Sequence, residues 1–214
     1  MSPAETRDWI TSRLDPIETY DPAKRIIHSD FDLNPPEAAG PPQIPRALSP
    51  AAVLVPLIQH DDGVTVLLTR RADTLRNHTG QVAFPGGRCD PGELPWETAL
   101  REAQEEIGLE PGYVTLAGLS SAYQTGSGFD ITPVVGFVRP GFVLKANPAE
   151  VADVFETPFA FLMDPNNYER RFMEQAAGVR RYFYAMTYAD RLIWGATAGM
   201  LRALYERLYG GAAQ

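Results

Sequence analysis

The stretch GGRCDPGELPWETALREAQEEIGL, residues 86–109, is the part of this sequence that decides the fold. Its opening residues are rich in glycine and proline, which excludes regular secondary structure there. Pro95 then stands where a helix can begin, because a first-turn proline loses no hydrogen bond by lacking an N–H. Gly108 is the residue type that commonly ends a helix. The stretch therefore predicts a loop followed by a helix over residues 95–107.

Two faces of this predicted helix carry different side chains. At 100° per residue, the apolar ones fall on one stripe: Trp96, Ala99, Leu100, Ala103 and Ile107. On the adjoining face, within about 100° of each other, lie Glu102, Glu105 and Glu106. Carboxylates at this spacing repel one another. A solvated acidic face is one interpretation. A site for Mg²⁺ or Mn²⁺, which prefer oxygen ligands, is the other.

Arg101 stands beside these acids, and both Glu93 in the loop and Glu97 one turn earlier are candidates to pair with it. Together, Gly87, Glu93 and REAQEEIGL (residues 101–109) resemble the signature of the Nudix hydrolases, G-x5-E-x7-R-E-U-x-E-E-x-G-U, where U is a bulky aliphatic residue. Every fixed position matches, although Ala103 is smaller than the usual aliphatic residue.

The resemblance implies an α+β fold, a Nudix-type α/β/α sandwich with a mixed β-sheet. It implies hydrolysis of a nucleoside diphosphate linked to another moiety, by attack of water on a diphosphate phosphorus. Glu105 and Glu106 would ligate Mg²⁺ or Mn²⁺, with Glu102 as a further ligand or as the base. Arg101 would orient a glutamate by ion pairing, and the Gly87 region would lend a backbone carbonyl. Divalent ions suit this chemistry because they neutralise the diphosphate and the charge that develops on the leaving oxygen.

The preceding segment limits the range of possible substrates. It covers residues 67–87 and reads LLTRRADTLRNHTGQVAFPGG. It is similar to the additional signature of the coenzyme A diphosphatase branch, L-L-T-x-R-[SA]-x3-R-x3-G-x3-F-P-G-G, and every fixed position matches. The implied reaction cleaves coenzyme A, and acyl or oxidised coenzyme A, to 3′,5′-ADP and 4′-phosphopantetheine. ADP-ribose, NADH or a dinucleoside polyphosphate are alternative substrates within the family. A non-enzymatic nucleotide sensor is a third hypothesis, but such proteins typically lose glutamates that are all present here.

Candidate substrate-binding residues lie in and near this segment. Arg71 and Arg76 occupy motif positions and Arg70 adjoins them; guanidinium groups suit the several phosphates of coenzyme A. Phe129 is able to stack on adenine. Glu150, in a loop outside the signature, is a candidate to complete the metal site or to act as base, and a solvated loop acid is the alternative.

The rest of the chain predicts strands at residues 51–59, 64–70, 114–119, 130–138, 151–156 and 181–186, a short helix at 158–162 and a longer one at 193–209. A helix over residues 4–14 and a proline-rich arm over 31–50 precede them. We therefore divide the chain into residues 1–50, the helix and arm, and residues 51–214, the Nudix hydrolase domain. The arm has the reach to contact a second copy of the chain, as in a homodimer.

Composition sets outer limits. The 214 residues carry a net charge of −8, which argues against a protein that mainly holds nucleic-acid backbone. One cysteine excludes a disulfide framework. No window approaches the roughly 18 apolar residues of a membrane span, and the N-terminus lacks the apolar run of a signal peptide. A cytoplasmic protein with a small-molecule substrate is the expectation.

Overall fold

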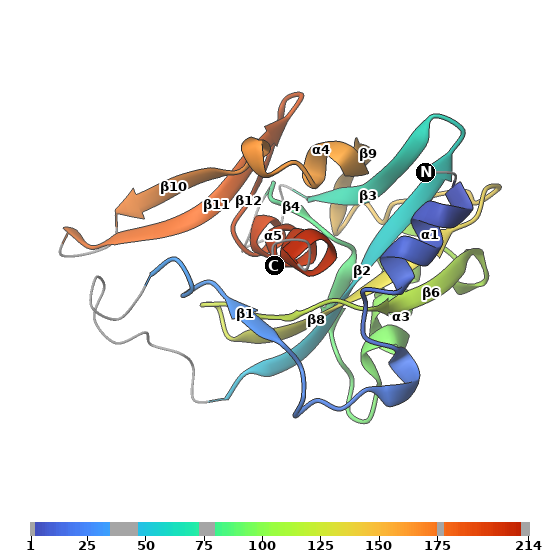
Figure 1. Ribbon diagram of the computed structural model, residues 1–214, viewed down its shortest axis with the longest axis horizontal. Helices are drawn as coiled ribbons and strands as arrows, with labels where there is room; N and C mark the ends of the chain where they lie inside the picture. The colour runs from blue at the N-terminus through green and yellow to red at the C-terminus, as the bar shows by residue number, and fades with distance from the viewer. Residues whose placement is uncertain (1–2, 35–46, 73–79, 175–177, 211–214) are drawn as a thin grey trace.

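A computed structural model describes residues 3–34, 47–72, 80–174 and 178–210 (Figure 1). The helices are α1 (Pro3–Thr11), α3 (Pro95–Ile107), α4 (Phe159–Leu162) and α5 (Ala196–Tyr209), with short 3₁₀ turns at Ile17–Thr19, Pro111–Tyr113 and Pro165–Asn167. The strands are β1 (Ile27–Ser29), β2 (Ser49–His60), β3 (Gly63–Arg71), β4 (Val82–Ala83), β5 (Gly86–Arg88), β6 (Val114–Leu119), β7 (Ala122–Gln124), β8 (Phe129–Val138), β9 (Val151–Pro158), β10 (Glu169–Glu174), β11 (Arg180–Tyr188) and β12 (Arg191–Trp194).

Within the described residues, nine strands form one mixed sheet. Its main path runs β1-β7-β8-β2-β3-β4, while β5 pairs with β2, β6 with β8 and β9 with β3. The pairs β1–β7 and β2–β8 are parallel, and β2–β3 is an antiparallel hairpin. A separate antiparallel sheet, β10-β11-β12, projects beside it in orange in Figure 1.

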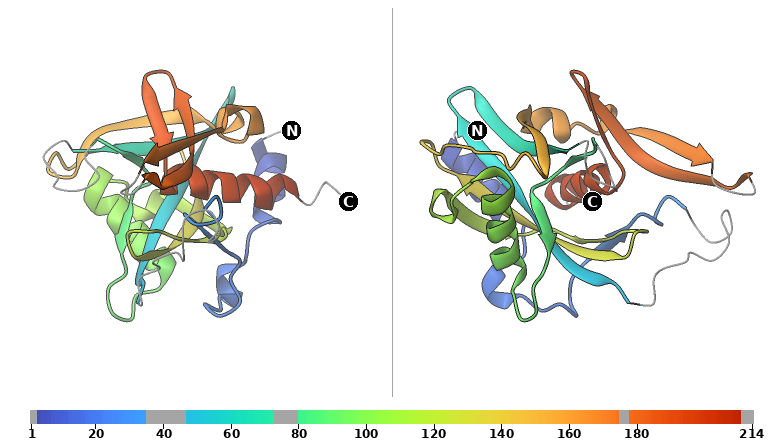
Figure 2. Two further views of the ribbon diagram at one scale, coloured as in Figure 1. Left: turned by 90° about the vertical axis from the view of Figure 1, so that its left-hand side faces the viewer. Right: turned by 180° about the vertical axis from the view of Figure 1, so that it is seen from behind.

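Alternate residues of the central strand β2 point to opposite faces of the sheet. Val53, Val55 and Leu57 join one buried cluster, which also contains the apolar residues of α5 and Ile10 of α1. Leu54 and Ile58 join the other cluster, which contains the apolar stripe of α3. The sheet is thus enclosed by α3 on one face and by α5 with α1 on the other (Figure 2). This is the predicted α/β/α sandwich.

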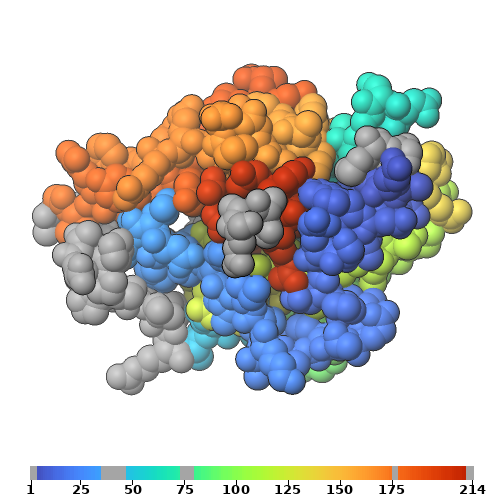
Figure 3. Space-filling model, viewed as in Figure 1, coloured from blue at the N-terminus to red at the C-terminus, as the bar shows by residue number. Residues whose placement is uncertain are grey.

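The N-terminal segment and the C-terminal elements meet on the α5 face. In the space-filling view, α5 lies in red between the blue N-terminal residues and the orange strands (Figure 3). Trp9 of α1 contacts Tyr209 of α5, with ring centroids 5.0 Å apart. Within the described ranges, no helix is long and apolar enough to cross a membrane.

Most predicted elements form at the predicted places, and α3 begins and ends at the predicted residues. The predicted start of the last helix at residue 193 is wrong. Ile193 lies in β12, paired with Met186, and the helix begins only at Ala196, after Gly195. Most of the proline-rich arm, residues 35–46, lies outside the described residues.

Candidate active site

The loop before α3 is attached to the sheet at one end and to the helix at the other. The expectation that Gly86 and Gly87 lie outside regular secondary structure is wrong, because Gly86–Arg88 pair with β2 as the strand β5. β5 pairs antiparallel with β2, so Gly87 lies opposite Ala52. At the helix start, Pro95 is the first residue and the Glu97 carboxylate accepts the Leu94 N–H at 2.8 Å. Gly108 ends α3 with a φ of 70°, a left-handed conformation that favours glycine. The local sequence therefore fixes which face of α3 meets the loop.

Arg101 ties the loop to the acidic face of α3. Its Nε and Nη2 donate to the two carboxylate oxygens of Glu93 at 2.9 and 3.0 Å, and Nη2 also donates to the Arg88 carbonyl at 3.1 Å. Nη1 donates to Glu102 at 2.7 Å and to Glu105 at 3.3 Å. Of the two candidate partners from the sequence, Glu93 is therefore the one that pairs with Arg101.

Glu93 is correspondingly acidic. The hydrogen bonds from Arg101 lower the pKa of its carboxyl to about 2, against a smaller opposing effect of burial, and the Asp90 N–H and the Thr98 hydroxyl also lower it. The same contacts raise the pKa of the Arg101 guanidinium. The pair is thus ionised at neutral pH, and it holds the loop against the helix.

Glu102 rests against the backbone of Gly87. A Cβ atom at Gly87 would lie 2.5 Å from the Glu102 carboxyl carbon, so that side chain would have to move. The glycine therefore leaves the space that the carboxylate occupies. Burial raises the pKa of Glu102, Arg101 lowers it, and the charges of Glu105 and Glu150 raise it.

Glu106 is the buried member of the three helix glutamates, with a relative exposure of 5%. Burial raises the pKa of its carboxyl to about 7; the Gly86 N–H, donated at 3.2 Å, and the charge of Arg71 lower it, while Glu102 and Glu150 raise it. Because the charge of Glu150 acts on the pKa of both Glu102 and Glu106, and that of Glu102 acts on Glu106, the three carboxylates lie within electrostatic range of one another.

Glu150 reaches this group from the loop before β9. Asn147 donates its N–H to the Glu106 carbonyl at 2.8 Å and its side-chain amide to the Glu150 carboxylate at 2.9 Å. The Glu150 carbonyl in turn accepts the Ala72 N–H at 2.8 Å. Asn147 is a positioning residue that the sequence reasoning missed, and only its place three residues before Glu150 could have indicated it.

The remaining predicted residues differ in placement. Glu105 is exposed on α3 and Arg70 lies in β3. Arg71, at a bulge in β3, has a buried Nε without a hydrogen-bond partner in the described part of the chain. Phe129 begins β8, with the Arg88 guanidinium carbon 5.2 Å from its ring centroid. Arg76 lies outside the described residues.

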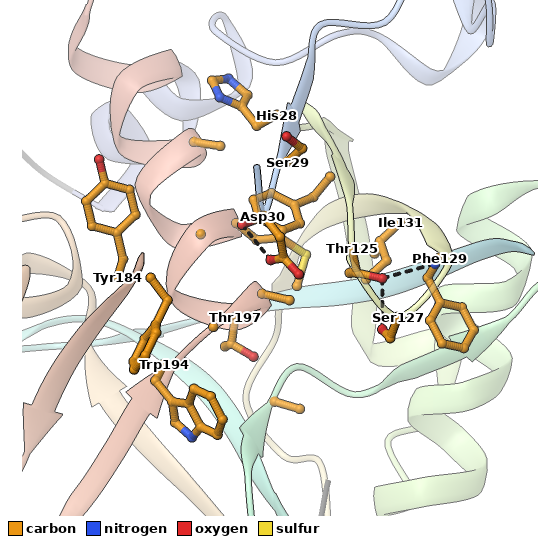
Figure 4. A pocket seen from close by; sticks show the side chains of 18 of the residues that line it. His28, Ser29, Asp30, Thr125, Ser127, Phe129, Ile131, Tyr184, Trp194 and Thr197 are labelled. Carbon is orange, nitrogen blue, oxygen red and sulfur yellow. Dashed lines mark hydrogen bonds between the residues drawn. The ribbon is translucent and has the colours of Figure 1, made fainter. Parts of the chain in front are cut away.

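A cavity of about 590 Å³ opens beside the loop. Arg71, Gly86, Gly87 and Arg88 line its end nearest the glutamates. Figure 4 shows Thr125, Ser127, Phe129 and Ile131 on one side and Tyr184, Trp194 and Thr197, from β11, β12 and α5, across from them. Of the residues on the first side, the sequence predicted Phe129. The opposite wall was missed, because it combines segments that are distant in the sequence.

The residues present fit a divalent cation by their chemistry. The candidate donors, three carboxylates on α3 and the backbone at Gly87, are all hard oxygens, as Mg²⁺ and Mn²⁺ prefer. Because Gly87 has no Cβ atom, the Glu102 carboxylate can lie against its backbone. Among residues 3–34, 47–72, 80–174 and 178–210, no three His, Cys, Asp or Glu side chains already surround one point. Arg101 donates from Nη1 to one oxygen each of Glu102 and Glu105, so it holds these two carboxylates near one another and leaves the second oxygen of each outside these hydrogen bonds.

Comparison with known proteins gives the family of the chain. The model of the NUDIX domain matches residues 48–176. An uncharacterized Nudix hydrolase named NudL from Photorhabdus laumondii is 40% identical, over 78% of this chain and 91% of that protein. A protein of the same name from Yersinia enterocolitica is also 40% identical, over 74% of this chain and 80% of its own. Among solved structures, the MutT protein of Methanosarcina mazei Go1 aligns with 80% of this chain and 100% of its own, at 18% identity and a TM-score of 0.49.

The fold, the loop–helix unit and these matches define the class: the chain belongs to the Nudix family. It is a Nudix hydrolase, an enzyme that cleaves diphosphate bonds in derivatives of nucleoside diphosphates, and enzymes of this family generally use divalent metal ions.

Proposed function

We propose that this chain hydrolyses the diphosphate bond of coenzyme A, and of acyl or oxidised coenzyme A, to 3′,5′-ADP and 4′-phosphopantetheine. The observation that carries the proposal is the segment at residues 67–87, which retains every fixed position of the coenzyme A diphosphatase signature and runs directly into the Nudix signature. Hydrolysis of ADP-ribose or NADH would not account for this additional segment.

Arg71 supports the proposal from its position. Its guanidinium lies close enough to Glu106 to lower the pKa of that carboxyl, and it also lines the cavity. The buried Nε has no hydrogen-bond partner within the described residues, although burial of an unpaired donor is costly. A phosphate group lying between the glutamates and the cavity would supply the missing acceptor. Arg76 and Arg70 are proposed to serve the other phosphates, on the strength of the sequence.

Mg²⁺ or Mn²⁺ is the proposed cofactor, with Glu102, Glu105, Glu106 and the Gly87 backbone as the residues that would hold it. The bound cation would neutralise negative charge on the diphosphate. Around it, the chain's own groups orient the reaction. Arg101, fixed by Glu93, holds the position of Glu102.

Water attacks one diphosphate phosphorus, the bond to the bridging oxygen breaks, and a carboxylate accepts the proton of the water. Glu102 and Glu150 are the two candidates for this base. Both lie within electrostatic range of Glu106, and the Asn147 side-chain amide donates to Glu150 and fixes its position. Phe129 is proposed to stack on the adenine, with the Arg88 guanidinium already over its ring.

Product identity tests the proposal. Purified protein is incubated with coenzyme A and Mg²⁺ or Mn²⁺, and the products are separated by chromatography. Formation of 3′,5′-ADP and 4′-phosphopantetheine in equal amounts is expected. Cleavage of ADP-ribose without any 3′,5′-ADP from coenzyme A would contradict the substrate and leave the Nudix activity standing. A homodimer through the proline-rich arm remains a further proposal, tested by light scattering of the full chain and of a chain lacking that arm.

A further inference from the structure

The far wall of the cavity has no role in the chemistry described so far. Its residues lie outside the family match at residues 48–176. The segment around β1 precedes that match in the sequence, and β11, β12 and α5 follow it. The near end, at Gly86 and Gly87, adjoins the glutamates. A group attached to the diphosphate can therefore extend from the reaction centre into a pocket that the Nudix domain itself does not provide.

This far wall is mainly apolar. Two aromatic side chains, Tyr184 and Trp194, lie beside the helix residues Ala196, Met200 and Ala203, which recur at helical spacing along one face of α5. Trp194 is fixed by Phe183, with ring centroids 5.3 Å apart. A cavity of about 590 Å³ with walls of this kind is typical of sites that bind small molecules.

Two polar groups on this wall, on Thr197 and Arg202, are already paired within the protein. The Thr197 hydroxyl donates to the Val82 carbonyl at 2.9 Å. The Arg202 guanidinium donates to Glu206 at 2.7 Å. Neither group needs a hydrogen bond from a ligand, so the wall favours an occupant that has few polar atoms.

The part of the far wall that comes from the segment around β1 is held in place by Asp30. Its carboxylate accepts the Tyr123 hydroxyl at 3.0 Å, the Gly126 N–H at 2.8 Å and the Arg181 guanidinium at 2.9 Å. Asn34 adds two contacts to the Tyr182 backbone, donating to its carbonyl and accepting its N–H. The segment at residues 27–34 is thereby bound to both sheets. The cavity is formed before any ligand arrives, which lowers the cost of binding.

We propose that this cavity binds the acyl chain of a medium-chain acyl thioester of coenzyme A, and that the enzyme prefers such substrates to free coenzyme A. The inference rests on the proposed function, which places the diphosphate at the glutamates of α3, a phosphate group at Arg71 and the extended arm in the cavity. Trp194, Tyr184 and Met200 contact the chain and set the preference for its length.

The test measures kcat/KM for free, hexanoyl-, octanoyl- and decanoyl-coenzyme A, all below the concentration at which they aggregate. Full burial of one methylene is worth about fourfold in binding. We expect an overall rise of at least about tenfold from hexanoyl to decanoyl, which allows for partial burial. A kcat/KM that does not change with chain length would overturn the proposal.

Trp194→Ala is the main variant, and the readout is the ratio of kcat/KM for decanoyl to that for free coenzyme A. We expect this ratio to fall about tenfold. Leu192→Ala is the matched control, because Leu192 is an exposed apolar residue on the same strand that does not line the cavity. Its ratio should equal that of the wild type. If Trp194→Ala weakened both substrates by the same factor, the wall would hold a part common to both, such as the nucleobase, and the proposal would be wrong.

Ala196→Leu tests the same wall without removing a large side chain. Ala196 is only partly buried at the start of α5, so a larger residue there narrows the cavity. The decanoyl preference should fall while the melting temperature stays within a few degrees of the wild type. An unchanged preference in a folded Ala196→Leu protein would overturn the proposal.

A binding measurement separates this inference from the proposed function. S-decanoyl pantetheine carries the acyl chain and no diphosphate, and its binding is followed by calorimetry. If the wild type cleaves no coenzyme A, the proposed function fails, and binding of this compound that is weakened by Ala196→Leu would still support the acyl pocket. If coenzyme A is cleaved but S-decanoyl pantetheine does not bind, the acyl pocket fails and the proposed function stands.

Discussion

Arg101 and Glu93 form a two-point ion pair, in which Nε and Nη2 of the arginine each donate to one carboxylate oxygen at 2.9 and 3.0 Å. The pair joins the loop to the middle of α3 and leaves the third nitrogen, Nη1, for Glu102 and Glu105. The geometry of the acidic face therefore depends on a carboxylate that is not itself a candidate metal ligand.

The pH dependence of stability should report this pair. The folded-state pKa of Glu93 is about 2, below its usual value, so the unfolded chain binds the proton more readily. The stabilisation is fully present above about pH 5 and is lost as the pH falls through 4 toward 2. Glu93→Gln should lower the free energy of unfolding by about 2 kcal/mol at pH 7, and by progressively less below pH 4.5.

Urea denaturation between pH 7 and pH 3 measures this difference, with Glu18→Gln, at an exposed glutamate, as the control. A difference between wild type and Glu93→Gln that stays constant over the whole range would show that Glu93 is not held in its ionised form.

Glu105→Gln should cut kcat by about three orders of magnitude, because it removes the negative charge of a proposed ligand of the cation at the reaction centre. Since Glu105 is exposed, the melting temperature should hardly change. Glu110→Gln makes the same charge change just beyond the helix and should retain wild-type kcat. Comparable turnover in Glu105→Gln and Glu110→Gln, measured at saturating Mg²⁺, would remove Glu105 from the proposed metal site.

Gly87→Ala should abolish most activity in a folded protein. The added methyl group would lie 2.5 Å from the Glu102 carboxyl carbon and must displace that side chain. We expect a loss of at least about a hundredfold in kcat/KM, from the misplacement of a catalytic group. Gly112→Ala is the control, since its Cβ would meet nothing within 4 Å. Full activity in Gly87→Ala would mean that Glu102 does not act from its present position.

Arg71→Ala should raise KM more than it lowers kcat, because a charge-assisted hydrogen bond to a remote phosphate stabilises ground state and transition state alike. A rise of about tenfold or more is expected. Arg71→Lys should restore part of the affinity, since it keeps the charge and loses the fork of donors. Arg139→Ala, at an exposed arginine, is the control. A fall in kcat at unchanged KM would place Arg71 at the reacting phosphorus instead.

The sequence predicts the loop–helix unit closely because its signals are local. Glycine and proline set the ends of α3, and the helical period sets its faces. The helical period does not predict that Glu106 is buried while Glu105 is exposed, because this difference depends on how α3 packs on the sheet. Nor could it find Asn147, which acts through the carbonyl of Glu106.

Elements that depend on distant partners were harder to predict. Ile193 fits the apolar stripe of the final helix, yet pairing with Met186 places it in a strand. β1 exists because Ile27 lies parallel to Ala122, a partner almost a hundred residues away. The cavity has the same origin, because its walls meet only when both ends of the chain pack against the sheet.

The most direct test of the account is the ratio of kcat/KM for coenzyme A to that for ADP-ribose, measured with one preparation at saturating Mg²⁺ or Mn²⁺. NADH and a dinucleoside polyphosphate complete the panel. The account predicts a ratio of about a hundred or more, because ADP-ribose lacks both the 3′-phosphate and the extended arm. A ratio of one or below would contradict the assignment of coenzyme A as the substrate.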